Sequence, residues 1–164
     1  MDAPVTRVDA RAFVIPTEEP ESDGTLEWDH TTLILVEVEA GGVRGLGYTY
    51  ADASCVELIA RVLAPCIRGR DPFATGAAWD AMLHAVRNVG RAGAGMMAIS
   101  AVDVALWDLK ARLLGVSLGA LLPRVRDTVP IYGSGGFTSY DEARLCEQLA
   151  AWVGAGIPRV KMKV

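Results

Sequence analysis

The sequence has no apolar run near the ~20 residues that a membrane-spanning helix needs, so we expect no membrane partner. It also has no basic block. Its 16 Lys and Arg against 20 Asp and Glu give a formal net charge of −4, which argues against nucleic acid as the main partner. The start, "MDAPVTRVDA", lacks a basic n-region and an apolar h-region, and we therefore expect no signal peptide.

Cysteine and histidine are scarce as well. The three cysteines form no CxxC pair and their number is odd, so we expect small apolar core residues in a reducing compartment, the cytoplasm, and neither disulfides nor a zinc site. The two histidines make a Ser/His/Asp triad unexpected, and no Walker loop, HExxH or GxSxG motif occurs. Hydrophobic residues are abundant at 51%, against 22% charged, which is typical of a globular chain.

The first fifty residues alternate between strand and loop signals. Val5–Ile15 is rich in β-branched residues and predicts a strand, while Thr31–Glu39 and Val43–Tyr50 predict an antiparallel hairpin closed by a glycine turn. Between them, Pro16–His30 is polar and acidic with two prolines and a glycine, which predicts a loop. A structureless connection of this length is usually a functional lid or disordered, and the sequence leaves both open.

The apolar period then changes from 2 to 3.6 residues, which predicts helices at about 54–67, 74–89 and 97–114. The third is apolar nearly all round, so we expect it at the centre of its domain, with Gly115 as its C′ residue. Asp103 and Asp108 are five residues apart and do not share a helix face. We interpret both as structural, with Asp108 pairing with Arg112.

The end of the chain predicts a strand, a helix and a second strand, at Thr128–Gly136, about Tyr140–Val153 and Ile157–Val164. A connection of this length requires the two strands to be parallel. Two strands and one helix cannot close a core, and a lone parallel pair leaves its faces and edges exposed. We therefore expect the chain to be the front part of a longer protein.

The final strand carries two lysines, Lys161 and Lys163, on one face, while the apolar residues Val160, Met162 and Val164 share the other. By itself this alternation usually indicates that the charged face of the strand is exposed to solvent. If the apolar residues face covering helices, however, the lysines point inward, where amines are costly unless used. Two ammonium groups about 6.6 Å apart disfavour each other's charge, which suits a general base that removes a C–H proton near neutral pH.

The order of these parts resembles the mandelate racemase/muconate lactonizing enzyme family of the enolase superfamily. The resemblance covers essentially the whole chain, including "MAISAVDVALWDLKARLLG", "VPIYGSGG" and "VKMKV". It implies an α+β capping domain over residues 1–125, with a three-stranded antiparallel sheet followed by helices and an active-site lid loop at 16–30. Residues 126–164 would then be the first strands of an incomplete α/β (TIM-type) barrel.

The resemblance also implies catalytic roles. Lys163 would be the proton-abstracting base, and Lys161 would assist it and hold the substrate carboxylate. The Mg²⁺ ligands, three carboxylates at the ends of barrel strands three to five, would lie beyond Val164. We therefore expect no metal ligand within these 164 residues and no turnover by them alone.

Substrate contacts are implied at one position after the first barrel strand and at three in the lid. These four residues are Ser134, Trp28, His30 and Glu18. The substrate would be a small carboxylate. We favour a sugar acid because acid-sugar dehydration is common in the branch that the sequence resembles, and the polar lid could meet a polyhydroxylated substrate.

The implied enzyme is a cytoplasmic, Mg²⁺-dependent homo-oligomer that removes the proton α to a carboxylate. We favour acid-sugar dehydration, a lyase reaction. The same lysines would also serve racemisation, epimerisation or cycloisomerisation, so an isomerase is the alternative. An alternative of another class is a non-catalytic binding module or fragment, for which the unfinished strand pair would need a partner chain.

Overall fold

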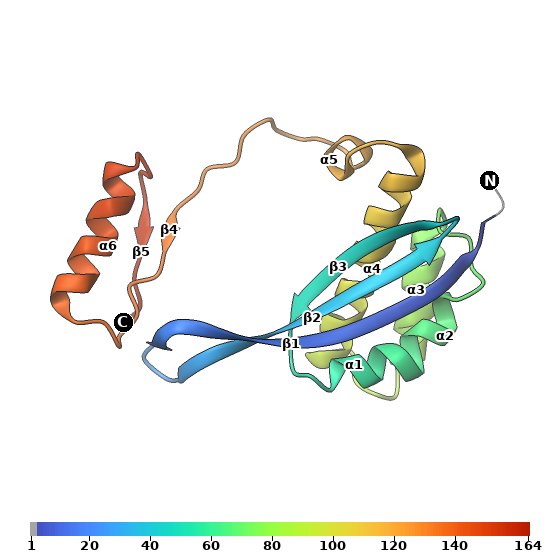
Figure 1. Cartoon of the computed structure of the whole chain (residues 1–164), viewed down its shortest axis with the longest axis horizontal. Coiled ribbons are helices and arrows are strands. Elements are labelled where there is room, and N and C mark those ends of the chain that lie inside the picture. Colours follow the sequence, from blue (N-terminus) through green and yellow to red (C-terminus); the bar gives the residue numbers. More distant parts are fainter. Residues whose placement is uncertain (1–2) are drawn as a thin grey trace. The chain divides into compact units, whose positions relative to one another are not determined.

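The computed structural model describes residues 3–164, which form two compact units. The first contains the chain up to Val14 and Thr32–Arg124, and the second contains Ile15–Thr31 and Val125–Val164 (Figure 1). The elements are, in chain order, β1 (Val5–Ser22), β2 (Glu27–Ala40), β3 (Val43–Tyr50), α1 (Cys55–Leu58), the π-helical turn η1 (Ile59–Leu63), α2 (Ala64–Ile67), α3 (Thr75–Ala85), α4 (Ala94–Leu114), α5 (Leu118–Leu121), β4 (Gly133–Ser134), α6 (Glu142–Gly154) and β5 (Val160–Lys161).

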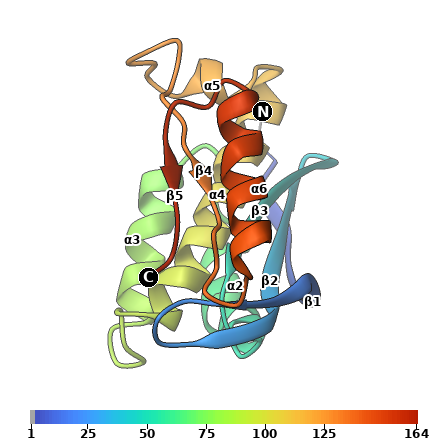
Figure 2. The same ribbon diagram turned by 90° about the vertical axis from the view of Figure 1, so that its left-hand side faces the viewer.

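Strands β1, β2 and β3 form one sheet in that order, with β2 in the middle (Figure 2). β2 and β3 are antiparallel, and their register runs from Leu33 opposite Tyr50 to Ala40 opposite Val43. The turn between them is Gly41-Gly42 with φ of 58° and 75°, values that glycine adopts without strain. The predicted three-stranded antiparallel sheet followed by helices is confirmed.

One face of the sheet carries the core of the first unit. Alternate residues of β2 point to this face and are fully buried, namely Ile34, Val36, Val38 and Ala40. The helices cover this face, and α4 packs along β3 (Figure 1). The contact is close because Gly45 and Gly47 of β3 have no side chains. A Cβ atom at Gly47 would lie 2.1 Å from the carbonyl oxygen of Ala101 in α4.

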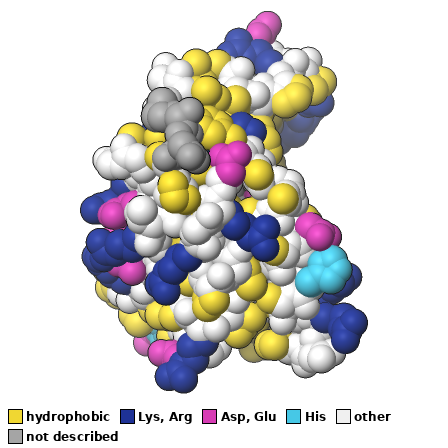
Figure 3. Space-filling model, turned by 90° about the vertical axis from the view of Figure 1, so that its right-hand side faces the viewer, with side chains coloured by type: hydrophobic (Ala, Val, Ile, Leu, Met, Phe, Trp, Pro, Cys, Tyr) yellow, Lys and Arg dark blue, Asp and Glu magenta, His cyan; other side chains and the backbone are white. Residues whose placement is uncertain are grey.

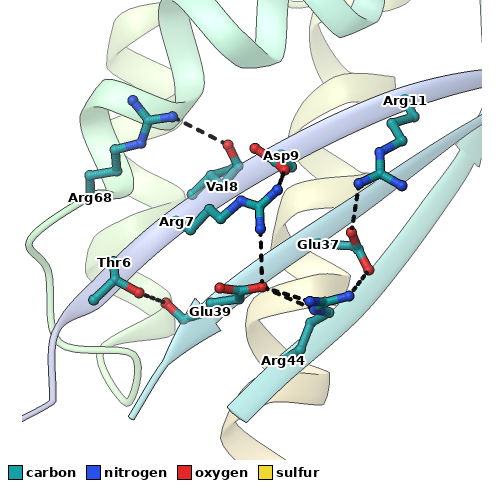
Figure 4. A network of polar contacts seen from close by, with 9 residues as sticks. All are labelled: Thr6, Arg7, Val8, Asp9, Arg11, Glu37, Glu39, Arg44 and Arg68. Carbon is teal, nitrogen blue, oxygen red and sulfur yellow. Dashed lines mark hydrogen bonds and ion pairs between the residues drawn. The ribbon is translucent and has the colours of Figure 1, made fainter. Parts of the chain in front are cut away.

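The opposite face of the sheet carries a network of charges (Figure 4). Arg44 on β3 pairs with Glu37 and Glu39 on β2, at nitrogen–oxygen distances of 2.8 and 3.0 Å. Arg7 on β1 approaches Glu39, and Arg11 approaches Glu37, each at 3.6 Å. These pairs link all three strands, although each partly exposed pair stabilises the sheet by only about 1 kcal/mol or less.

Helix α4 confirms two details of the prediction. It ends at Leu114, and Gly115 follows in the left-handed conformation with φ of 69°. Asp108 accepts a hydrogen bond from Nε of Arg112 at 2.7 Å. The same carboxylate accepts one from the backbone N–H of Leu46 at 2.8 Å, so Asp108 also fastens β3 to the helix.

Asp103, also on α4, borders a pocket of about 320 Å³ in the first unit. The pocket is lined by Thr75, Gly76, Trp79, Asp103 and Trp107. Burial raises the pKa of the Asp103 carboxyl above its ordinary value of 3.8, because a desolvated carboxylate loses the water that stabilises its charge.

We expect Asp103→Asn to raise the melting temperature at pH 7 but not near pH 4. The pKa of Asp103 is higher in the folded than in the unfolded chain, so ionisation opposes folding. Below about pH 3.8 the carboxyl is protonated in the folded and the unfolded chain, so it does not oppose folding. The destabilisation grows as the pH rises and is complete once the pH exceeds the folded-state pKa. Calorimetry of the variant and the wild type at both pH values checks this, and an equal difference at the two would contradict it.

The segment Pro16–His30 is not a loop, and the prediction of its secondary structure is wrong. β1 continues to Ser22 and β2 begins at Glu27, so the segment is the outer part of a β-hairpin, which we call the distal hairpin (Ile15–Thr31). Pro16 and Pro20 are tolerated because β1 is an edge strand, where a residue without an N–H need not bond a neighbouring strand.

The turn of the distal hairpin is built around the Asp23 carboxylate. Its Oδ1 accepts hydrogen bonds from the backbone N–H groups of Thr25 and Leu26 at 2.8 and 2.9 Å, and from the Thr25 hydroxyl at 2.8 Å. The backbone N–H of Asp23 donates to the Leu26 carbonyl at 3.0 Å. An acidic residue that looked like generic loop polarity is therefore the structural centre of a tight turn.

The second unit also contains the predicted strand–helix–strand arrangement. β4 and β5 are parallel, with Gly133 opposite Val160 and Ser134 opposite Lys161, and α6 connects them (Figure 1). Each strand is shorter than predicted, because within residues 3–164 each has only the other as a partner. Trp152 of α6 packs on the strand pair, since a Cβ atom at Gly133 would lie 2.3 Å from its ring.

The surface is of mixed charge on the face shown in Figure 3, where Lys and Arg side chains stand apart with acidic and apolar atoms between them. Within residues 3–164, no helix is both long and apolar enough to cross a membrane.

Candidate active site

The two lysines lie at the end of β5 and differ in exposure. Lys163 is half-buried, whereas Lys161 is exposed. Both amines were expected to point inward only if helices covered the apolar face of the strand. The apolar face is not buried, since Val160 and Met162 are 40% and 46% exposed. One helix and one neighbouring strand cover too little of β5 to bury either face.

The hydrogen bonds between the two strands continue beyond β5 with a slip of one residue. The carbonyl of Lys161 accepts from the N–H of Gly135 at 3.3 Å, as a regular parallel ladder requires. The N–H of Lys163 then donates to the carbonyl of Gly136 at 2.8 Å, whereas an unbroken ladder would use Gly135. Gly136 has φ of 59°, which glycine adopts readily. Such bulges redirect the side chains beside them, here that of Lys163.

Phe137 follows this bulge and contacts the Lys163 amine. The Nζ atom of Lys163 lies 6.0 Å from the centre of the Phe137 ring. The ring also makes edge-to-face contacts with Trp28 of the distal hairpin, at 5.7 Å between centroids, and with Tyr140, at 5.6 Å. The predicted base thus lies beside an aromatic cluster formed by segments far apart in the sequence.

Hydrogen bonds join the distal hairpin to the residues after Phe137. The N–H of Thr138 donates to the Ser22 carbonyl at 3.0 Å, and the hydroxyls of Thr138 and Ser22 lie 2.7 Å apart. The Thr138 hydroxyl also donates to the Asp23 carbonyl at 3.1 Å, and the Ser139 hydroxyl to the Pro20 carbonyl at 2.8 Å. The hairpin is therefore held against the end of the strand pair by directed contacts.

Charges contribute to the same arrangement. The pKa of the Asp23 carboxyl is lowered, chiefly by the hydrogen bonds from the N–H groups of Leu26 and Thr25, and to a smaller extent by the positive charge of Lys163. Arg144 of α6 forms an ion pair with Glu19 of β1. Asp23 is thus a carboxylate within electrostatic range of the Lys163 amine.

Trp28, a predicted substrate contact, is half-buried on the distal hairpin. Its Nε1 donates to Glu21 at 2.8 Å, which fixes the indole against Phe137. A shallow pocket of about 260 Å³ lies beside it, lined by Pro20, Glu27, Trp28 and Asp29. Trp28 is therefore the residue of the distal hairpin that the ring of Phe137 connects to Lys163.

The other predicted substrate contacts are more dispersed. His30 is exposed, with its Nδ1 2.6 Å from Oδ1 of Asp29, a contact that lowers the pKa of the Asp29 carboxyl. Glu18 is exposed on β1, and Ser134 is exposed opposite Lys161. Within residues 3–164, no hydrogen bond or ion pair joins these three side chains to either lysine.

The described part of the chain does not offer a magnesium site. Within residues 3–164, no three His, Cys, Asp or Glu side chains lie close enough together to hold a metal ion. Mg²⁺ needs several oxygen ligands in octahedral geometry, which no group of carboxylates here supplies.

Phe137, Thr138 and Ser139 were not predicted as site residues. Their importance comes from contacts with the distal hairpin, some 115 residues away in the sequence, as between Thr138 and Asp23. The one available signal was an aromatic residue directly after the glycines of "GSGGF", where a loop at a strand end commonly carries function.

Comparison with known proteins finds close relatives along most of the chain. Residues 11–123 match the family described as "Mandelate racemase / muconate lactonizing enzyme, N-terminal domain". A crystal structure of a mandelate racemase/muconate lactonizing enzyme-like protein from Rubrobacter xylanophilus is 57% identical, with a TM-score of 0.96, and the match covers 98% of this chain and 45% of that one.

Two relatives have named activities. A 3,6-anhydro-alpha-L-galactonate cycloisomerase from Streptomyces coelicolor is 32% identical over 96% of this chain and 45% of its own length. An L-talarate/galactarate dehydratase from Salmonella typhimurium is 33% identical over 80% of this chain and 34% of its own length. The chain thus spans less than half the length of these relatives.

The relatives as a group are acid-sugar dehydratases, cycloisomerases and racemases, and several of their solved structures contain bound magnesium. The match extends over the sheet, the helices and most of the second unit, and it agrees with the observed capping-domain architecture. The chain therefore belongs to the mandelate racemase/muconate lactonizing enzyme family of the enolase superfamily, whose N-terminal capping domain it contains.

Proposed function

We propose that this chain is the front part of an enzyme that removes the proton α to a carboxylate, with Lys163 as the base. The observation that carries the proposal is the position of Lys163, half-buried after a bulge at the end of a parallel strand and beside the aromatic cluster of Trp28, Phe137 and Tyr140. We assign residues 1–125 to the capping domain and 126–164 to the start of the barrel. The grouping of the distal hairpin with the latter supports its role as a lid.

The neutral Lys163 amine would take the α-proton. The electron pair of the broken C–H bond would then move toward the carboxylate. The exposed Lys161 ammonium, two residues earlier on the same strand, would hold that carboxylate and offset its growing charge. Ser134, opposite Lys161, would add a hydroxyl contact, and Trp28, His30 and Glu18 would contact the remainder of the substrate from the distal hairpin.

The substrate proposed is a polyhydroxylated sugar acid, and the reaction its dehydration. Loss of the α-proton and of the β-hydroxyl, which leaves as water after protonation, gives an enol that becomes a 2-keto acid. The polar rim beside Trp28, with Glu27 and Asp29, would suit substrate hydroxyls. Mg²⁺, bound in several solved relatives, would stabilise the negative charge, with ligands from outside residues 3–164.

An isomerase is the second candidate. The cycloisomerase relative matches almost the whole chain, and the same first step, removal of an α-proton, begins racemisation and cycloisomerisation. Which product forms would depend on groups opposite Lys163. A cytoplasmic homo-oligomer remains our expectation for the complete protein.

Incubating the full-length protein and Mg²⁺ with a panel of aldonic and aldaric acids in deuterated water tests the proposal. We expect at least one acid to give a 2-keto product, detected as its semicarbazone, with deuterium incorporated at the α-carbon. Exchange or isomerisation without a 2-keto product would favour the isomerase. If no acid exchanges its α-proton, the non-catalytic binding module becomes the better interpretation.

A further inference from the structure

Phe137 is the residue through which the distal hairpin reaches Lys163. It is half-buried, and its ring lies between Trp28 of the hairpin, at 5.7 Å, and the Nζ atom of Lys163, at 6.0 Å. Among residues 3–164, no other aromatic ring contacts this amine. The Phe137 ring thus connects the hairpin to the amine.

The position of this ring is fixed on both sides. On one side, Thr138 bonds the backbone of Ser22 and Asp23, at 3.0 and 3.1 Å. On the other, the Lys163 N–H bonds the carbonyl of Gly136, directly before Phe137, at 2.8 Å. A displacement of the distal hairpin would therefore move the ring relative to the amine.

The lysine side chain gains from such a support. It has four rotatable bonds and loses substantial rotamer entropy when its amine is held in one place. An aromatic face attracts the ammonium form and limits the rotamers of both forms. The carboxylate of Asp23, which lies within electrostatic range of Lys163, acts on the amine from the turn of the hairpin.

We propose that Phe137 is a positioning residue that holds the Lys163 amine and makes its placement depend on the docked distal hairpin. The inference rests on the proposed function, in which Lys163 is the base. A base held within reach of the reacting proton raises the rate of the chemical step, whereas the binding of the substrate carboxylate depends on other groups.

The test replaces Phe137 in the full-length protein and follows exchange of the substrate's α-proton with deuterium. Phe137→Leu removes the ring and keeps an apolar side chain, so we expect kcat for exchange to fall about tenfold while KM changes less than about twofold. Phe137→Tyr restores the ring and should restore kcat. Phe13→Leu is the matched control, since it makes the same change at an exposed ring of β1 in the first unit, and it should leave kcat near the wild-type value.

A second readout does not depend on activity. After reductive methylation with ¹³C-formaldehyde, the Lys163 methyl signal, assigned by its loss in Lys163→Met, should carry a ring-current shift that disappears in Phe137→Leu and persists in Phe137→Tyr. If Phe137→Leu does not fold, Phe137→Met takes its place with the same expected result.

The outcomes separate the two proposals. If Lys163→Met retains normal exchange, the assignment of the base fails and the role of Phe137 in catalysis fails with it. If Lys163→Met is inactive while Phe137→Leu keeps its kcat and the Lys163 signal does not move, only the positioning role of Phe137 is overturned. A rise in KM at constant kcat would likewise overturn it, since that pattern indicates that Phe137 only packs the hairpin against the substrate.

Discussion

Lys163→Met in the full-length protein should lower the rate of exchange of the substrate's α-proton with solvent deuterium by about 10²- to 10⁴-fold, the usual contribution of a general base. Methionine keeps the length and the apolar stem of lysine and removes the amine. Because Lys163 is only half-buried, the fold should survive the change. Deuterium incorporation, followed by NMR or mass spectrometry in the presence of Mg²⁺, measures the effect.

Lys161→Met is the matched control, since it makes the same change two residues earlier on the same strand. We expect this variant to retain part of its exchange activity while KM for the acid rises about tenfold or more, because a charged hydrogen bond to the carboxylate is lost. If β5 were only a solvent-exposed edge strand without a catalytic role, both variants would exchange the substrate's α-proton at the normal rate. Normal exchange by Lys163→Met alone would place the base elsewhere, and the assignment of Lys163 would be lost.

The fold of the first unit was largely predictable from local patterns. The residues of Thr31–Glu39 predicted a strand and the 3.6-residue period of residues 97–114 predicted a helix, and the structure has β2 and α4 at these places. The cap at Gly115 and the ion pair between Asp108 and Arg112 follow from short spacings. These features are readable because the interactions that fix them lie within a few residues.

The distal hairpin was missed because its composition and its structure disagree. Prolines, acidic residues and a glycine are typical of a loop, yet an edge strand tolerates Pro16 and Pro20, and Asp23 builds the turn. What makes the segment a hairpin is strand pairing together with its contacts to Thr138 and Ser139. Contacts between residues more than a hundred positions apart do not affect the local pattern of apolar residues, so this pattern cannot predict them.

The candidate site also has a part that could be predicted from the sequence and a part that could not. Lys161 and Lys163 could be selected as candidates because they share one face of the final strand and because "VKMKV" resembles the family motif. Phe137 could not, because its role arises only where the distal hairpin and the strand pair meet. The exposure of Lys161 could not be predicted either, since burial of a strand face depends on how many elements cover it and not on the strand itself.

Gly47→Ala should destabilise the first unit by about 3 kcal/mol, the upper part of the range for overpacked cores. The added Cβ would lie 2.1 Å from the Ala101 carbonyl oxygen and 2.6 Å from the backbone nitrogen of Ala105. Both atoms belong to the backbone of α4, so no side-chain rotation relieves the clash, and the helix must move away from β3. That movement would loosen the buried face of the sheet over which α4 packs.

Gly76→Ala is the matched control for this prediction, because it makes the same change in helix α3, where the new Cβ would meet no atom within 4 Å outside its own stretch of helix. Alanine favours a helix over glycine, so this variant should be as stable as the wild type or more stable, by up to about 1 kcal/mol. Urea denaturation, followed through the fluorescence of Trp79 and Trp107 in the first unit, compares the two variants. If Gly47→Ala unfolded at the wild-type midpoint, the close contact of β3 with α4 would not limit side-chain size at this position. The difference between two identical substitutions thus isolates the contribution of that helix–strand contact.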